Sequence, residues 1–429
     1  MQQDRSAYFE MGYSDDFGIT GLAEQLCSRP AVDLPAALTA VGDLADGSDG
    51  EEAVELGEDA RRLLDGLLPE EVLHTVWLAA VGRVFDPADH GMDTRAWLRA
   101  VSDVATNRLR RNRRSYAPPP VRPVRDEALC REIVAEVRGL SADLVRASFA
   151  SDLAAHLEQV IVLADADVGF RFFLRALKTH AVCVSKERYD RFLGLGERLG
   201  YPVAVVRDGL TVDWPPIDTT HRQTSWDFGF SRLAGSAHQD WRPDAAVDEV
   251  HMVAYTDEPR QPPGTTAALL LEDALRLLRS PLSDNAITAL WIAVSDAALR
   301  IDGRDWLRLI ATVCEERLRE VAPAYTPVTP PARTELTGTV LAELREVALT
   351  VGDKAISPHW QPLPAVDAMT ALEQVIERVD PDLGFRLFLR VMWTLCVRIT
   401  REQYQRYEAI GERFGYGEYH VNNVEDLVE

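Results

Sequence analysis

The sequence has few cysteines, few lysines and no long apolar run. Its five cysteines are odd in number and show no CxxC spacing, which argues against a disulfide framework and against a zinc knuckle. The apolar runs, such as 267–271, are far shorter than the ~20 residues that a membrane-spanning helix needs. The first residues lack the basic start and apolar centre of a signal peptide. We therefore expect a cytoplasmic protein with no membrane partner.

Motifs of catalysis and cofactor binding are also missing. The sequence contains no P-loop, HExxH or GxSxG motif. Glu71 and His74 have the spacing of a di-iron ligand pair, but no second such pair stands on a matching helix. The glycines at 194, 196 and 200 lie within and at the end of a predicted helix, where they cannot form a dinucleotide loop. We predict no catalytic residue, no metal site and no cofactor.

The strongest positive signal is an internal repeat. Residues 169–201 return without a gap as residues 384–416, and sixteen of the 33 paired positions are identical. Ser-Asp-Asp-Phe-Gly at 14–18 is likewise echoed by Ser-Trp-Asp-Phe-Gly at 225–229. We interpret the chain as a tandem duplication. The predicted domains are two homologous α-helical repeats, residues 1–212 and 213–429.

The predicted fold class is mainly α, with each repeat a helical bundle of about 210 residues. Apolar stripes that contain Trp77 and Trp291 predict paired helices, and a proline-rich connector near 116–124 recurs near 325–332. Asp165 and Asp380 are predicted N-caps of the helices that carry the repeated stretch. The segment 211–266 matches residues 1–60 only in patches, so we predict no helix there and leave its structure open, a few short strands or turns being one alternative.

The repeat allows one internal comparison of candidate polar residues. The histidines at 74, 156 and 180 pair with Thr288, Ala371 and Leu395, and Glu71 pairs with Asn285. A site that existed before the duplication would have had the chance to leave its residues in both halves. This comparison argues against an ancestral metal or acid/base site, although one half could have kept a site that the other lost.

The formal net charge of −22 is high for 429 residues and is concentrated toward the N-terminus. Such charge promotes solubility and can steer a basic partner to the protein. The candidate partner-binding residues are Asp15, Asp16, Glu51, Glu52, Glu55, Glu58 and Asp59.

Two sets of arginines are candidates for binding an anion. One is the run near residue 110, which could bind phosphate but could equally neutralise the C-terminus of a helix. The other recurs in both repeats at i, i+4 spacing, where a solvated ion-pair network is the structural alternative. The candidates are Arg108, Arg110, Arg111, Arg113, Arg114, Arg171, Arg175, Arg386 and Arg390.

These patterns favour a non-enzymatic, acidic binding protein of bacterial type. The most concrete hypothesis is the capture of a protein partner, as by a toxin-neutralising immunity protein or a similar inhibitor. The alternative is a helical enzyme or small-molecule-binding protein with its site in the cleft between the two repeats. Nucleic acid is not an expected partner, and the oligomeric state is left open.

Overall fold

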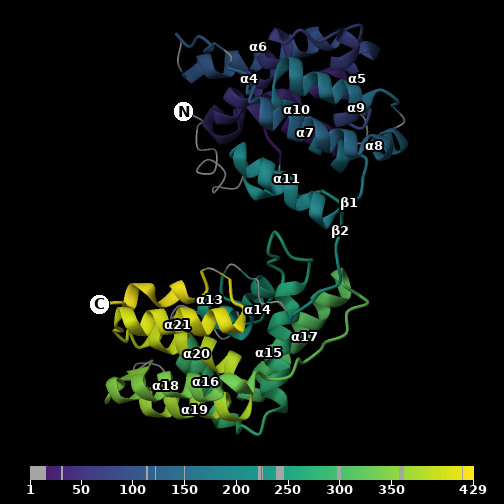
Figure 1. The fold of residues 1–429 in the computed structure, drawn as a ribbon. Helices are drawn as coiled ribbons and strands as arrows, with labels where there is room; N and C mark the ends of the chain where they lie inside the picture. Colours follow the sequence, from purple (N-terminus) through teal and green to yellow (C-terminus); the bar gives the residue numbers. More distant parts are fainter. Residues whose placement is uncertain are drawn as a thin grey trace. The chain divides into compact units, whose positions relative to one another are not determined.

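The structure is a computed structural model and shows a mainly helical protein (Figure 1). The chain divides into two compact units, Met1–Trp214 and Pro215–Glu429. The boundary predicted from the sequence lies two residues before this division. The prediction of a mainly α fold is confirmed. The structure describes residues 16–29, 32–112, 115–120, 122–148, 150–220, 224, 226–237, 246–296, 301–356, 362–417 and 419–429.

The first unit is built from helices and one pair of very short strands. Strands β1 and β2 pair in parallel, with Val184 opposite Val212. In chain order the elements are α2 (Gly18–Cys27), α3 (Leu34–Asp46), η1 (Gly47–Gly50), α4 (Glu51–Asp65), α5 (Glu70–Ala80), η2 (Pro87–His90), α6 (Thr94–Asn112), α7 (Glu127–Gly139), α8 (Ser141–Ser148), α9 (Leu153–Gln159), η3 (Val160–Ala164), α10 (Ala166–Thr179), β1 (Val184–Ser185), α11 (Lys186–Arg198), α12 (Val203–Arg207) and β2 (Val212–Asp213).

The second unit has a similar series of elements. Its strands β3 and β4 pair antiparallel, with Ile356 opposite Leu363. In chain order the elements are α13 (Gly229–Ser236), α14 (Ala246–Ala254), α15 (Thr265–Arg279), α16 (Asp284–Ser295), α17 (Gly303–Val321), η5 (Thr334–Leu336), α18 (Thr337–Val351), β3 (Ala355–Ile356), β4 (Leu363–Pro364), α19 (Ala365–Arg378), α20 (Pro381–Thr394), α21 (Arg401–Phe414) and η6 (Val421–Leu427).

Each unit has its own apolar core, and the predicted tryptophan stripes lie inside it. In the first unit the rings of Trp77 and Trp97 pack with centroids 5.8 Å apart, and Trp97 is fully buried. In the second unit Trp291 and Trp306 are both fully buried, 5.0 Å apart. Among the described residues, no helix has both the length and the apolar character needed to cross a membrane.

The helices α10 and α20, in which the repeated stretch begins, are buried over most of their length: residues 166–178 of α10 and 381–389 of α20 are all buried. Helix α10 lies in the middle of the first unit, where it packs against α2, α5 and α7 (Figure 1). Asp165 caps α10 by accepting from the Val168 N–H at 2.9 Å, and Asp380 caps α20 by accepting from the Asp382 N–H at 2.8 Å. Both predicted caps are therefore confirmed.

The segment 211–266, for which we predicted no helix, contains helices as well as the short strand β2 in the part that the structure describes. The helices α13 and α14 lie within it, and α15 begins at its end. Helix α14 forms because Val250, Val253 and Ala254 recur at i, i+3 and i+4 and are all buried in the core. The apolar pattern covers only one turn and polar residues flank it, so this helix was not predicted from the sequence.

Candidate functional site

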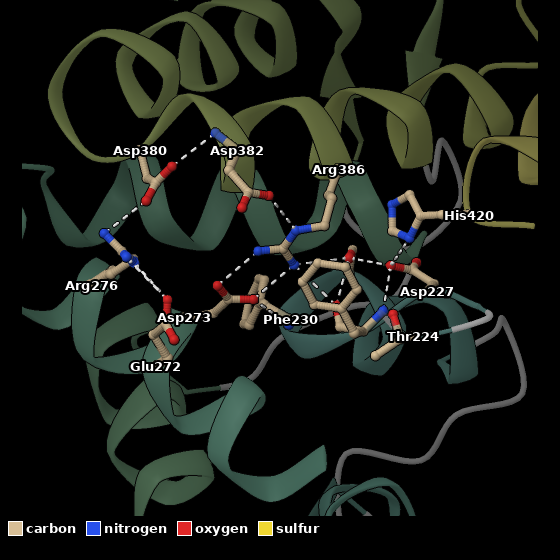
Figure 2. A network of polar contacts seen from close by, with 12 residues as sticks. Thr224, Asp227, Phe230, Glu272, Asp273, Arg276, Asp380, Asp382, Arg386 and His420 are labelled. Atoms are coloured by element: carbon tan, nitrogen blue, oxygen red, sulfur yellow. Dashed lines mark hydrogen bonds and ion pairs between the residues drawn. The ribbon is translucent and has the colours of Figure 1, made fainter. Parts of the chain in front are cut away.

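A fully buried arginine holds together three segments of the second unit. The guanidinium of Arg386 donates to both carboxylate oxygens of Asp273, at 2.8 and 2.9 Å, and to Asp382 at 3.1 Å (Figure 2). It also donates to the Phe228 carbonyl at 3.0 Å and lies over the Phe228 ring, 4.3 Å from its centroid. Helix α20 is thereby bonded to α15 and to the residue that precedes α13.

The first unit contains the same arrangement around Arg171. This side chain donates to both oxygens of Asp59 at 2.7 Å and to Asp167 at 3.0 Å. It donates to the Phe17 carbonyl at 3.1 Å and lies 4.2 Å from the centroid of that ring. Burial alone would lower the pKa of Arg171, but the carboxylates of Asp167 and Asp59 raise it well above its usual value.

A second arginine in each unit extends the network toward the cap of the central helix. In the second unit Arg276 forms ion pairs with Glu272 at 3.0 Å and with Asp380 at 2.7 Å (Figure 2). Burial and the neighbouring charge of Asp382 raise the pKa of Asp380 to about 6, against the opposing effect of Arg276. Arg62 lies at the corresponding place in the first unit, 3.6 Å from Asp165.

The repeated Asp-Phe-Gly triplet has a structural reason. Gly18 and Gly229 have φ of +59° and +63°, a left-handed conformation that favours glycine. A Cβ on Gly18 would lie 2.0 Å from Oδ2 of Asp59, and one on Gly229 would lie 2.1 Å from Oδ2 of Asp273. The triplet therefore lets the chain approach the buried carboxylate closely enough for the next N–H to donate to it.

These contacts change the interpretation of the repeated arginines. We expected charges on a solvated helix face, but Arg171 is 0% and Arg386 1% exposed. For these two arginines the solvated-network alternative is thus wrong, because α2 packs on α10 and α13 packs on α20, and the guanidinium groups bond to Asp59 of α4 and Asp273 of α15. Since internal carboxylates occupy both guanidinium groups, an external anion would have to displace a carboxylate to bind there.

The other repeated pair, Arg175 and Arg390, differs between the units. Arg175 is almost buried and forms ion pairs with Asp16 at 3.1 Å and with Glu24 at 3.0 Å. It also donates to the Thr179 hydroxyl at 3.0 Å. Its charge is therefore neutralised inside the first unit.

Arg390 has no ion pair with any other residue that the structure describes, and its buried Nε has no hydrogen-bond partner among them. When the two Asp-Phe-Gly triplets are aligned, residue 17 pairs with residue 228. Gly235 then pairs with Glu24 of the first unit. A Cβ on Gly235 would lie 3.4 Å from the guanidinium carbon of Arg390, so the missing carboxylate belongs at this spot. Burial lowers the pKa of Arg390, with Asp227 opposing it, and the group nonetheless stays charged near neutral pH.

Asp227, which pairs in sequence with Asp16, bonds to other groups. It accepts from the Phe228 N–H at 2.8 Å and from the Ser231 hydroxyl, and its Oδ1 lies 3.9 Å from Nδ1 of the buried His420. His420 stands where the first unit has Val205, the residue whose carbonyl accepts from Lys178 at 2.9 Å. The polar partners around Arg390 have thus been rearranged relative to those around Arg175.

A cavity of about 510 Å³ lies next to Arg390, wholly within the second unit. Its wall combines two arginines with an aromatic ring, since Trp393 is 43% exposed. The lining residues are Gly235, Ala237, Ser295, Asp296, Arg390, Trp393, Thr394, Cys396, Arg398, Asp426 and Leu427. A concave site with a cationic group and an apolar surface suits a small molecule that carries a negative charge.

The candidate acidic residues do not form one surface. Asp16 and Asp59 are buried and paired with Arg175 and Arg171 respectively, so neither is accessible to a partner. Glu58 pairs with Arg62 at 2.9 Å. The remaining candidates lie in the first two turns of α4: Glu51 is exposed, while Glu52 and Glu55 are half-buried. Asp15 lies outside the described residues.

The candidate arginine run sits at the end of α6 and interacts within the first unit. Arg108 and Arg111 form ion pairs with Asp46 of α3, the latter at 3.7 Å. Arg110 donates to the Tyr116 carbonyl at 3.3 Å. Arg113 and Arg114 lie outside the described residues. The described contacts match the alternative in which these cations are neutralised internally.

Glu71 and His74, which have the spacing of a di-iron ligand pair, do not form a metal site. The His74 imidazole lies 3.0 Å from Asp86, whereas Glu71 lines a different cavity with His156 and His180. Within the described part of the chain, no group of three or more His, Cys, Asp and Glu residues could hold a metal ion.

Sequence reasoning did not find the partners of the buried arginines. Asp167 lies four residues before Arg171 on the same helix, a spacing that can be read from the sequence, but Asp59 is 112 positions away. The sequence already pairs Glu24 with Gly235. This difference indicates a binding site only once the structure shows that Gly235 lies beside the largely buried Arg390.

Comparison of the chain with protein-family models, with curated proteins and with solved structures finds no match.

Proposed function

We propose that the protein binds a small molecule bearing a carboxylate, in the cavity beside Arg390. The observation that carries this proposal is the largely buried guanidinium of Arg390, which lies next to Gly235 and has no ion pair with any residue that the structure describes. A buried charge without a partner is costly, so a ligand that supplies the missing charge gains a strong, charge-assisted hydrogen bond. In the first unit, the Glu24 carboxylate occupies the corresponding place, 3.0 Å from Arg175.

The rest of the cavity favours a ligand with an apolar part. The exposed face of Trp393 offers an aromatic surface, and Ala237 and Leu427 lie in the same wall. Arg398 adds a second cation, while Asp296 and Asp426 would reject a ligand with several negative charges in the wrong places. The best candidate is therefore a monocarboxylate with an aromatic or aliphatic body.

Calorimetric titration with a panel of aromatic and aliphatic monocarboxylates, each beside its uncharged amide, tests this proposal. We expect saturable binding of at least one acid, no binding of its amide, and at least tenfold weaker binding to Arg390→Met. Gly235→Glu should also abolish binding, because the new carboxylate would take the place of the ligand. The proposal is wrong if no acid binds or if Arg390→Met binds the acid as tightly as the unchanged protein.

A thiol-labelling experiment locates the ligand without removing Arg390. Cys396 lines the cavity and is exposed, whereas Cys183 is exposed in the first unit. A bound acid should slow the labelling of Cys396 and leave Cys183 unchanged. Equal protection of both thiols would contradict binding in this cavity.

The second candidate function is the capture of a basic protein partner, for which the net charge of −22 is the supporting observation. A toxin-neutralising immunity protein remains the concrete form of this proposal, in a cytoplasmic setting. Native mass spectrometry of the protein purified from its own host distinguishes the two. A bound basic protein that leaves at high salt supports capture, and a small bound acid supports the first proposal.

The two units are best explained as products of a tandem duplication, and this origin is part of the proposal. It is supported by the matching contacts of Arg171 with Asp59 and of Arg386 with Asp273. Under this hypothesis one copy kept an internal carboxylate beside the arginine, and the other lost it and opened a ligand site.

A further inference from the structure

A second cavity, of about 210 Å³, lies inside the first unit. It is formed by α5, α9 and the ends of α8 and α10. Polar side chains dominate its wall. The lining residues are Glu71, Thr75, Leu78, Ala79, Arg83, Ser148, Ala150, Ser151, Asp152, His156 and His180.

Two histidines in this wall have buried ring nitrogens without partners. Nδ1 of His156 and Nε2 of His180 have no hydrogen-bond partner among the described residues, and His156 is only 9% exposed. Burial lowers the pKa of His180, with the Ala79 backbone opposing the shift, so this imidazole is neutral near pH 7. Buried polar atoms in folded proteins nearly always have a partner, and leaving one without costs roughly 1–3 kcal/mol.

The fold itself does not require these polar side chains. The sequence repeat pairs Glu71, His156 and His180 with Asn285, Ala371 and Leu395. Ala371 and Leu395 are apolar and buried in the core of the second unit. Since the corresponding helices pack with apolar residues at these two positions, the histidines of the first unit call for a different explanation.

Charges of both signs stand in the same wall. Glu71 and Asp152 are exposed carboxylates, and neither forms an ion pair with another residue that the structure describes. Arg83 is also exposed and has no such pair, and its φ of +62° is a left-handed conformation that a non-glycine residue rarely adopts. Strain of this kind is concentrated at functional sites, where it positions a side chain.

We propose that this cavity binds a compact zwitterion, an α-amino acid or a similarly small aminocarboxylate. Glu71 and Asp152 receive the ammonium group, Arg83 receives the carboxylate, and the two imidazoles bond to the polar remainder. A volume of about 210 Å³ corresponds to roughly seven waters at the density of the liquid, which limits the ligand to about this size. This proposal is independent of the Arg390 cavity, which lies in the other unit.

The test is calorimetric titration of the full chain with each of the twenty common α-amino acids. Every amino acid that binds is compared with the amine that lacks its carboxylate and with the acid that lacks its amino group. The diagnostic variants are His156→Ala and His180→Leu, which introduce the residues that the second unit carries. The matched control is His74→Thr, which introduces the paired residue Thr288 at a histidine outside the cavity.

We expect at least one amino acid to bind saturably, and both diagnostic variants to weaken it at least tenfold. His74→Thr and Arg390→Met should leave the affinity within about twofold. Absence of saturable binding by all twenty overturns the proposal, as does unchanged affinity in both diagnostic variants. Equal binding of the amine alone overturns the assignment of a zwitterion, because Arg83 would then have no role.

Discussion

Arg171 and Asp59 form a two-point ion pair in which both side chains are completely buried, with both nitrogen–oxygen distances at 2.7 Å. The pair joins α10 to α4, and the same guanidinium holds the carbonyl of Phe17. Arg386 and Asp273 form the equivalent pair in the second unit. These pairs explain why the repeated stretch contains an arginine, Arg171 or Arg386, on a helix whose other buried residues are mostly apolar.

Removal of the Arg171 side chain should destabilise the first unit strongly. Arg171→Leu removes the two-point partner of Asp59 and leaves Asp59 and Asp167 with the longer contacts to Arg62, 3.5 and 3.4 Å. Breaking a buried pair in this way typically costs about 3–5 kcal/mol in the free energy of unfolding. The control is Arg146→Leu, because Arg146 is 77% exposed and its pair with Asp143 is solvated. Urea denaturation should show a change within about 0.5 kcal/mol for the control. Equal losses in the two variants would contradict a structural role for the buried pair.

The close approach at Gly18 should make it far less tolerant of a side chain than an open left-handed glycine. Gly91 has φ of +71° with nothing within 4 Å of a Cβ, so Gly91→Ala reports the backbone strain alone, about 1 kcal/mol. Gly18→Ala adds a collision with Asp59, and we expect roughly 1–3 kcal/mol more. Thermal denaturation of the two variants measures the difference. Similar melting temperatures would show that the carboxylate moves aside freely.

The two equivalent arginines Arg175 and Arg390 should respond differently to the same substitution. Arg175→Met removes two ion pairs and takes one cation away from the buried Asp16, so we expect a loss of about 2–3 kcal/mol. Arg390→Met removes a charge that has no ion pair with another described residue and keeps the apolar stem, so the change should be within about 1 kcal/mol. Urea denaturation without added ligand measures both. A larger loss for Arg390→Met would mean that its charge already has a partner.

Asp380 should titrate near pH 6 and make the second unit less stable as the pH rises. Its pKa is raised to about 6 in the folded protein, from about 3.9 in an unfolded chain. The folded state therefore holds the proton more tightly, and the contribution to stability is complete below about pH 4 and lost as the pH rises through 6. Two units of pKa correspond to at most about 3 kcal/mol.

Carboxyl-carbon NMR measures this titration directly, and Asp380→Asn identifies the signal by its disappearance. The variant should also lack the part of the pH dependence between 4 and 6 that belongs to this group. Asp284, an exposed carboxylate of the same unit, serves as the reference through Asp284→Asn. A signal of Asp380 that titrates below pH 4 would show that Arg276 outweighs burial.

Helix limits and caps were largely predictable because their causes lie within a few residues. The Asp165 and Asp380 caps each depend on an N–H two or three positions away, and Thr400 forms a capping box with Gln403. The helix α14 was missed because its apolar spacing is short, and its stability comes from burial of Val250 and Val253 rather than from a local signal.

The candidate site was only partly predictable. Arg390 was among the anion-binding candidates, but the sequence ranked it equally with Arg171, Arg175 and Arg386. Arg390 differs from Arg175 because Gly235 lies beside it, where Arg175 has the carboxylate of Glu24. Only the packing of α13 against α20 brings Gly235 and Arg390 together. The histidine cavity was not predicted at all, since Glu71 lies on α5, His156 on α9 and His180 directly after α10.

Periodicity, caps and the internal repeat in the amino-acid sequence were enough to establish a mainly helical protein and the two stretches at the centre of its units, because these signals are local or can be read by comparing the chain with itself. Burial of a charge depends instead on every segment that packs around it. The folded arrangement alone therefore decides that Arg171 and Arg386 are internal, that Arg175 is neutralised, and that Arg390 has no ion pair with another described residue.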